Sequence, residues 1–437
     1  MTTVQAAAPG LRRGLGAVPL AAIVFFNVSG GPYGIEDMVP AFGPGLSLLL
    51  LVITPLVWSW PVALVMSELA AAMPDEGGYV TWVRRAFGPF WSFQVGWWSW
   101  IDSFVDVAVY PALFVEYVEF WRPDMSALER WGLALGFIVL LTALNLAGVH
   151  PVGRAAVVLT ACALVPVALF VLVGALSPMR APWQPFATEA TGLGAVGLGL
   201  AVVMWNYSGW DTPSTCLGET ESPARSFLRA QLTMVPLIAL AYVLPVAVAL
   251  ASGAVDWRTW DTGTLPAIAS SVGGAWLGHV VAAGAVVSTA GLFMSLLLTN
   301  SRLPFVLARD GLLPRGLAAI APSTGTPARA VLVSAAFYAA FAAFSFKDLI
   351  VLNIWLYSLA LLVELAAFLK LRRAAPDLPR PWRVPGGTGT AIVVAALPAA
   401  LSLLAMATAG WMNTAAGVIA ASTGLVAWLF VRPRRPE

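Results

Sequence analysis

Hydrophobic residues in this chain run in long unbroken stretches, and short polar connections separate the stretches. A helix needs roughly 20 predominantly apolar residues to cross the ~30 Å hydrocarbon core of a bilayer. The pattern therefore predicts an all-α integral membrane protein with twelve transmembrane helices. Their expected ranges are 17–43, 45–72, 87–119, 131–148, 155–176, 191–219, 230–252, 273–300, 328–346, 348–370, 389–408 and 412–431.

The composition agrees with a membrane protein. Of 437 residues, 59% are hydrophobic and 11% are charged, whereas roughly a quarter of a soluble domain is charged. A net charge of +2 gives no field that would attract nucleic acid. Two cysteines and two histidines are too few for a disulfide framework or a metal cluster. No nucleophile–base pair stands out, so we expect no cofactor, no metal and no enzyme.

The positive charges predict the orientation. Cytoplasmic loops are enriched in lysine and arginine. If both termini are cytoplasmic, nineteen of the 24 cationic residues lie on the cytoplasmic side and five on the other. We therefore expect cytoplasmic tails at 1–16 and 432–437, and a plasma membrane location.

Two of the predicted helices share an unusual motif. An aromatic residue is followed by Asn27, Ser29 and Gly30 in the first span, and by Asn206, Ser208 and Gly209 in the sixth. Glycine and the nearby proline weaken a helix, and freed backbone groups in hydrocarbon need partners. One interpretation is a pair of kinks that permit close packing.

The position of the two motifs favours another interpretation. One lies in an odd span and the other in an even span, so they run in opposite directions. Broken helices at matching positions of inverted repeats are typical of transporter binding sites. We therefore expect inverted repeats at 17–176 and 191–370, with two further helices at 389–431.

A stripe of residues, each four positions after the last, marks the third span: Gln94, Trp98, Asp102, Asp106 and Tyr110. Asp102 and Asp106 fall near the bilayer centre, and Asp211 follows the sixth-span break. No lysine or arginine lies at matching depth, and unpaired charge is costly there. These acids are protonated, hydrated or able to receive a cation, which makes Asp211, Asp106 and Asp102 the candidates for proton coupling. Asp102 and Asp106 could also cap or pair with a neighbouring helix.

Other polar residues support weaker interpretations. Glu36 and Asp37 are expected at the outer mouth, His279 as a packed histidine, and Trp355 and Tyr357 along the outer path or at the interface. Ser288 and Thr289 could supply hydroxyls to a sodium ion, although such hydroxyls often bond their own backbone. Acids near the cytoplasmic helix ends could pair with Arg302 or Arg309 as an inner gate, with Glu219 and Arg302 as the main candidates. These acids are Glu68, Glu219, Glu221 and Glu364.

Several motifs resemble the plant polyamine-uptake and L-type amino-acid transporter group of the amino acid–polyamine–organocation superfamily. They occur in order at 29–37, 76–83, 88–91, 110–111, 148–153, 205–219 and 300–311. The resemblance covers about residues 20–385 and implies a LeuT-like fold, with substrate between the unwound parts of spans one and six. It also implies that Asp211 contacts a substrate amine. Proton-coupled relatives often carry a lysine in the fifth span; this chain has none, so the proton carrier stays open.

Together these features predict a secondary active transporter that imports a polyamine or cationic amino acid by alternating access, with proton coupling. Its partners would be the amine or amino acid, protons and membrane lipid, without nucleic acid, and it would be a monomer or homodimer. Trp205 and Tyr207 would pack on the aliphatic part of the substrate, and Asp211 with Asp106 would hold its ammonium group. The expected substrate-binding residues are Ser29, Gly30, Gly31, Tyr33, Gly34, Asp106, Tyr110, Trp205, Asn206, Tyr207, Ser208, Gly209, Trp210 and Asp211.

Alternatives remain at this stage. A neutral amino-acid permease or exchanger would use the acids only for proton chemistry. A nutrient sensor would bind without transporting, but such proteins usually add a signalling tail. A channel is disfavoured by the paired helix breaks.

Overall fold

The computed structural model describes residues 11–176, 180–188, 200, 202–342 and 346–431. The predicted tail at 432–437, most of the tail at 1–16 and the first part of the sixth span lie outside these residues, as does the end of the ninth span. The described part of the chain is helical, and Leu15 and Thr220 form an isolated β-bridge.

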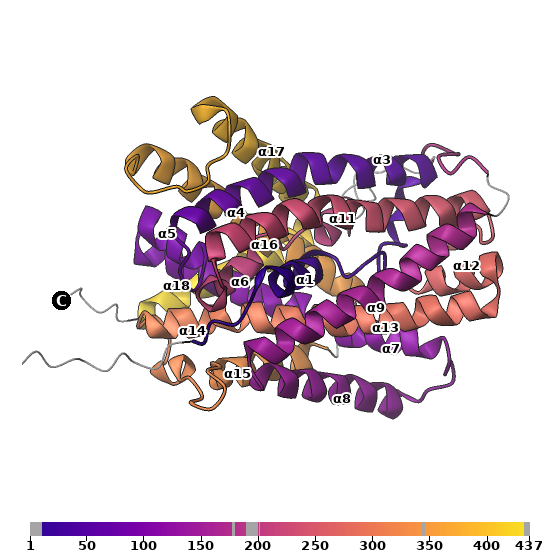
Figure 1. Cartoon of the computed structure of the whole chain (residues 1–437), viewed down its shortest axis with the longest axis horizontal. Helices are drawn as coiled ribbons and strands as arrows, with labels where there is room; N and C mark the ends of the chain where they lie inside the picture. Colours follow the sequence, from indigo (N-terminus) through magenta and orange to yellow (C-terminus); the bar gives the residue numbers. More distant parts are fainter. Residues whose placement is uncertain (1–10, 177–179, 189–199, 201, 343–345, 432–437) are drawn as a thin grey trace, which may run out of the picture.

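The helices form one elongated bundle (Figure 1). Those in the first half of the chain are α1 (Ala17–Val28), α2 (Met38–Phe42), α3 (Pro44–Thr54), α4 (Trp60–Ala72), α5 (Tyr79–Phe87), α6 (Pro89–Asp106), α7 (Val109–Glu119), α8 (Ala127–Leu146) and α9 (Val149–Ala175). A π-helical turn at Pro55–Ser59 joins α3 to α4.

Residues 202–206 form a short helix that leads into the second half. There follow the 3-10 helix η2 (Thr212–Glu219), α11 (Pro223–Ser252), η3 (Trp257–Thr259), α12 (Thr264–Gly273), α13 (Ala275–Asn300), α14 (Arg302–Arg309), η4 (Arg315–Ala318), α15 (Ala328–Phe341), α16 (Phe346–Ala374), α17 (Gly387–Thr408) and α18 (Trp411–Phe430).

Eight helices in the described residues are long and apolar enough to cross a membrane. They are Pro44–Ala72, Ala127–Leu146, Val149–Ala175, Pro223–Ser252, Ala275–Arg309, Asn353–Ala374, Gly387–Thr408 and Trp411–Phe430. Many apolar side chains face outward, including Leu140 at 69% exposure and Leu429 at 79%. Such a surface is suited to lipid rather than water.

The other four predicted spans are interrupted, short or partly outside the described residues. The first span is helical over Ala17–Val28 and again in α2, and the glycines from Gly30 onward break it in between. The third is split into α6 and α7 directly after Asp106, a break that the sequence analysis did not predict. The ninth span is helical over Ala328–Phe341. Predicted starts of the fifth and seventh spans were several residues late, since α9 begins at Val149 and α11 at Pro223.

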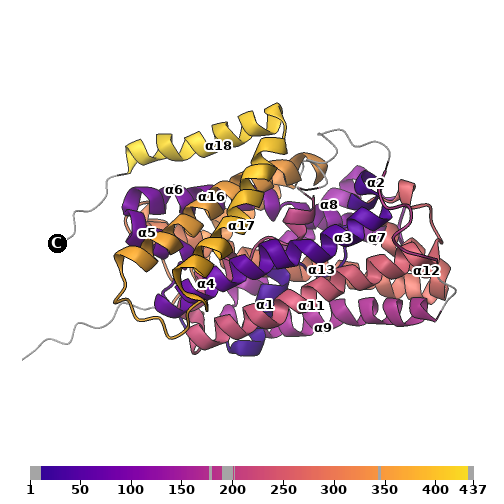
Figure 2. The ribbon, with the colours of Figure 1, turned by 90° about the horizontal axis from the view of Figure 1, so that it is seen from above.

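Helix α1 lies inside the bundle and packs against α9, α11 and α13. Helix α16 packs against α5, α6 and α17. Seen from above, α18 lies at the edge of the bundle (Figure 2), where it contacts α6 and α16. Helices α5 and α14 lie at one end of the bundle and α12 at the other (Figure 1). The two broken helices therefore meet in the interior.

Candidate functional site

The breaks of the first and sixth spans touch each other. A Cβ atom at Gly209 would lie 2.2 Å from the carbonyl oxygen of Asn27, and the φ of Gly209 is +94°. Both the close approach and the positive φ require glycine. The two copies of the motif make the same local contact. The side-chain amides of Asn27 and Asn206 each donate to the backbone carbonyl four residues earlier, at 2.8 and 2.9 Å.

Side chains satisfy the backbone groups that the sixth-span break releases. The Tyr242 hydroxyl donates to the Asn206 carbonyl at 2.8 Å, and the Trp58 indole donates to the Tyr207 carbonyl at 3.1 Å. The Gly209 N–H donates to the Tyr357 hydroxyl at 3.1 Å. At the first break, Ser288 donates to the Gly30 carbonyl at 2.6 Å. Such partners are what an interrupted helix needs in hydrocarbon.

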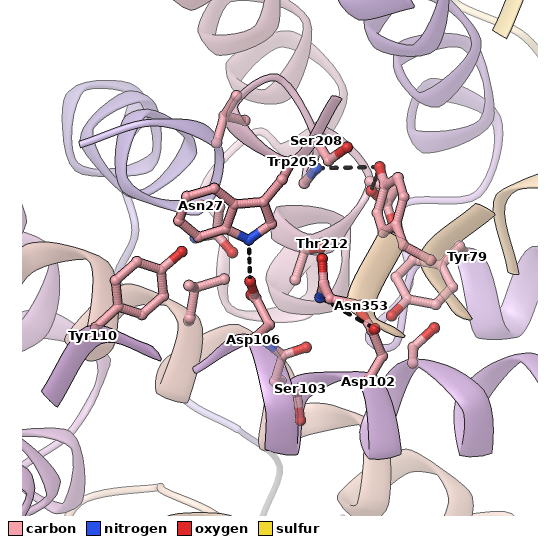
Figure 3. A pocket seen from close by; sticks show the side chains of 17 residues that line it. Asn27, Tyr79, Asp102, Ser103, Asp106, Tyr110, Trp205, Ser208, Thr212 and Asn353 are labelled. Carbon is pink, nitrogen blue, oxygen red and sulfur yellow. Dashed lines mark hydrogen bonds between the residues drawn. The ribbon is translucent and has the colours of Figure 1, made fainter. Parts of the chain in front are cut away.

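A polar cavity lies where the two breaks meet α6 and α16 (Figure 3). Its lining residues are Asn27, Val28, Tyr79, Ser99, Asp102, Ser103, Asp106, Tyr110, Trp205, Ser208, Gly209, Asp211, Thr212, Leu296, Asn300, Asn353 and Tyr357.

Three carboxylates dominate the chemistry of this cavity. Tyr357 donates to Oδ1 of Asp211 at 2.6 Å. The Trp205 indole donates to Oδ1 of Asp106 at 2.9 Å, and the Asn353 amide to Oδ1 of Asp102 at 3.1 Å (Figure 3). All three donors are neutral.

No compensating positive charge accompanies these acids. Lysine, arginine and histidine are absent from the described cavity lining, and none of the three carboxylates has an ion pair in the described part of the chain. Neutral donors orient a carboxylate but do not cancel its charge. The cavity is therefore suited to a group with several positive charges or to protons.

An aromatic wall adjoins the acids. The rings of Tyr110 and Trp205 are stacked with centroids 6.2 Å apart. Sequence reasoning placed Trp205 against a substrate, and the structure adds that its N–H is committed to Asp106. An aromatic face next to carboxylates can contact both methylene groups and a cation.

The structure brings part of the predicted substrate site together. Asp102, proposed for proton coupling, lines the cavity with these predicted binding residues: Asp106, Tyr110, Trp205, Ser208, Gly209 and Asp211. The remaining predicted residues are not among the lining: Ser29, Gly30, Gly31, Tyr33, Gly34, Asn206, Tyr207 and Trp210.

Two aromatic side chains lie elsewhere than predicted. Tyr207 is fully buried and its hydroxyl donates to the Leu51 carbonyl at 2.8 Å, so its ring packs in the protein core rather than against the cavity. The Trp210 indole donates to the Tyr207 carbonyl at 2.7 Å and closes the turn. Tyr207 thus bonds the neighbouring helix α3, and Trp210 bonds the broken segment itself.

Sequence reasoning also missed cavity residues. Tyr357 was assigned to an outer path or the membrane interface, yet it contacts both Asp211 and the Gly209 amide. Asn353, one turn earlier on α16, was not considered. The signal that could have found them is their spacing of four residues in the largely apolar middle of α16. Tyr79 and Asn300 also line the cavity. Each belongs to a motif that the sequence analysis used only for the family resemblance.

The predicted inner pair is present. Arg302 donates to both carboxylate oxygens of Glu219, at 2.8 and 3.0 Å, and both side chains are almost fully buried. Glu68 differs from the prediction, because it pairs with Arg372 and Arg380 and not with Arg302 or Arg309. Its position in α4 faces the end of α16, which carries Arg372.

Four further polar candidates have protein partners. Thr289 donates to the Val286 carbonyl of its own helix at 2.8 Å, and Ser288 holds the first break. The Trp121 indole donates to Nδ1 of His279 at 2.8 Å, as expected of a packed histidine. Glu36 is buried and accepts the Gly34 N–H at 2.8 Å, so it supports the first break rather than lying exposed at a mouth.

Comparisons with known proteins give a consistent result. A family model described as amino acid permease matches residues 16–431. Polyamine transporter PUT1 of Oryza sativa subsp. japonica is 33% identical over 98% of this chain and 80% of its own length. Polyamine transporter RMV1 of Arabidopsis thaliana is 34% identical, with 89% and 79% covered. An uncharacterized transporter of Mycobacterium tuberculosis is 32% identical, with 76% and 74% covered.

Proposed function

Because this chain belongs to the amino acid permease family, we propose that it is a secondary transporter that moves a polyamine across the membrane. Its family makes it a multi-pass membrane transporter rather than an enzyme. The observation that carries the substrate class is the cavity with Asp102, Asp106 and Asp211 and no cationic side chain in its described lining.

A polyamine matches the charge of this cavity and the aromatic wall beside its acids. Each ammonium group offers N–H donors to carboxylates, and charge-assisted hydrogen bonds are the strong ones. Asp102 and Asp106 lie one helical turn apart on α6, and Asp211 lies on the sixth-span break, so the cavity offers acids from two sides. The methylene segments between the amines would pack on Tyr110 and Trp205. The relatives in rice and Arabidopsis are named as polyamine transporters.

A neutral amino acid fits less well. Its carboxylate needs a cation or free amides, and the described lining holds no lysine, arginine or histidine. The Gly209 amide, which such a carboxylate could use, already donates to Tyr357. A cationic amino acid shares this difficulty at its carboxylate, so the cavity favours a substrate that carries only amines.

The proposal includes a fold and a mechanism. The eight continuous helices and the four interrupted or partly described ones would give twelve spans, with a LeuT-like pair of inverted repeats at 17–176 and 191–370. The Asn-x-Ser-Gly motif shared by the two breaks supports the repeat. Both termini would be cytoplasmic in the plasma membrane. Alternating access would open the cavity to each side in turn, with Glu219 and Arg302 as the inner gate and a proton gradient driving import.

Uptake into proteoliposomes tests this proposal. With an inward proton gradient, labelled spermidine and putrescine are expected to accumulate above the level of protein-free vesicles, and labelled leucine is not. Lysine serves as the comparison for a substrate that carries both amines and a carboxylate. Entry of leucine without entry of either polyamine would contradict the proposed substrate class.

Tyr357→Phe is expected to weaken spermidine uptake. The substitution removes the hydroxyl that donates to Asp211 and accepts from Gly209. A hydrogen bond to a charged group contributes about 1.5–3 kcal/mol, so the Michaelis constant should rise about tenfold or more. Initial uptake rates over a range of spermidine concentrations give this value. The matched control is Tyr117→Phe, at a buried tyrosine whose hydroxyl has no partner in the described residues; equal effects at both positions would contradict a site role for Tyr357.

A further inference from the structure

A fourth buried acid lies close to the cavity but outside its lining. Glu364 on α16 is 1% exposed. Within the described part of the chain, no hydrogen-bond donor reaches either of its carboxyl oxygens. Sequence reasoning considered pairing with Arg302 or Arg309, and neither ion pair is found. A carboxylate buried in this way is costly unless it is neutralised.

Glu364 lies on the same helix as two residues that line the cavity. Asn353, Tyr357 and Glu364 are spaced by four and seven residues, which places them on one face of α16. The first two hold Asp102 and Asp211. Glu364 lies about 10 Å further along the helix. The helix then continues to Arg372, at the end of the bundle that we propose to be cytoplasmic.

The other buried acids near this end differ from Glu364. Glu68 has Arg372 and Arg380, and Glu219 has Arg302. Glu76 also lacks a hydrogen-bond donor at its carboxyl oxygens in the described residues; the acid Glu219 is near it, but so are the cations Arg302 and Arg309. The charged neighbour of Glu364 is Asp211, another acid. Two neighbouring acids in a poorly solvated interior resist carrying charge together.

Few other groups can compensate Glu364. The titratable side chains that interact with it are Asp211, Tyr79 of α5 and Tyr357 of its own helix. Of the three cations at the end of α16, Arg372 is engaged by Glu68 of α4, and Lys370 and Arg373 are exposed. Helices α17 and α18 contain no charged residue, and α6 contributes Asp102 and Asp106. A proton is therefore the species that neutralises Glu364.

We propose that Glu364 carries the coupling proton; this inference rests on the proposed proton-driven uptake. If one carboxylate bound the amine and the proton alternately, the protein would exchange amine for proton across the membrane. Co-transport needs a second carboxyl that keeps its proton while the ammonium is bound, and Glu364 is near Asp211 without lining the cavity. The O–H bond forms with a proton from the outer side and breaks when the cavity opens to cytoplasmic water, which accepts the proton and leaves a carboxylate.

Two transport measurements on the full chain in proteoliposomes test the proposal. The first is accumulation of labelled spermidine driven by an inward proton gradient. The second is counterflow, with spermidine on both sides and no gradient, which requires alternating access but no net proton movement. Glu364→Gln is expected to lose accumulation, down to protein-free vesicles, and to retain counterflow at the wild-type rate. Glu364→Asp, which keeps an ionisable group, should retain accumulation.

The controls separate this inference from the proposed function. Asp377→Asn removes an exposed carboxyl from the loop after α16 and should leave both measurements unchanged. If wild-type protein shows counterflow without gradient-driven accumulation, the proposed coupling itself fails. If wild-type protein accumulates spermidine and Glu364→Gln does so equally, Glu364 is not the carrier. Loss of both activities in Glu364→Gln also overturns the proposal, because Glu364 would then serve transport rather than coupling.

Discussion

Replacing Asp211 with asparagine is expected to reduce spermidine uptake by about 100-fold or more. Asp211 lies at the sixth-span break, is buried, and is held by Tyr357 at 2.6 Å. Removing one partner of a buried ion pair costs about 3–5 kcal/mol, and each 1.4 kcal/mol corresponds to tenfold. Asparagine keeps the shape of the side chain and its hydrogen bond, so the loss would report the missing charge. Initial rates in proteoliposomes measure it.

The matched control is Asp377→Asn, the same change at an exposed aspartate. A binding measurement, such as thermal stabilisation of the purified protein by spermidine, distinguishes lost binding from misfolding. Asp211→Asn should keep the melting temperature of the substrate-free protein and lose the stabilisation. Full uptake by Asp211→Asn would remove this residue from the substrate site.

Most of the membrane organisation could be predicted from the sequence, because apolar length is a strong physical signal. The stretch Val149–Ala175 is nearly all apolar, so it is expected in lipid. There it forms a helix, because a helix satisfies all of its own backbone hydrogen bonds. Helix ends were less predictable. The break between α6 and α7 has no glycine, but Pro111 lacks the N–H that would donate to the Val107 carbonyl. This sign of an interruption was not used in the sequence analysis.

The cavity could be predicted only in part, for a geometric reason. Helical periodicity gives the direction of side chains along a regular helix, and it placed Asp102, Asp106 and Tyr110 correctly on one face. At a break the periodicity is lost. Tyr207 and Trp210 are near Asp211 in sequence, but they point into the core.

Residues from distant helices present a second difficulty. Asn353 and Tyr357 reach the acids only because α16 packs against α6 and the sixth-span break, which a single sequence does not reveal. The sequence shows that both side chains can donate a hydrogen bond, but it does not show that Asp102 and Asp211 are the acceptors. The same limit applied to Glu68, whose arginine lies 304 positions away.

Arg302→Met is expected to destabilise the protein and to open the end of the bundle that we propose to be cytoplasmic. Arg302 and Glu219 are 0% and 1% exposed, and Arg302 also donates to the Leu298 carbonyl at 2.8 Å. The pair joins the start of α14 to η2, the segment that follows the sixth-span break. Leaving Glu219 buried without its partner should cost about 3–5 kcal/mol. The melting temperature of the purified protein in detergent measures this loss, and Arg258→Met, at an exposed ion pair, should change it little.

Cys216 provides a separate measure of opening. It lies on η2 and is fully buried, and Cys162 is the other cysteine of the chain. In a Cys162→Ser background, a maleimide should label Cys216 faster when Arg302 is replaced. The double variant Glu219→Gln with Arg302→Met removes both charges of this pair, so it should recover stability while Cys216 stays accessible. If the double variant recovers stability and also protects Cys216 as in the wild type, the pair holds the fold but does not close the cavity. The gate would then have to be sought elsewhere on η2.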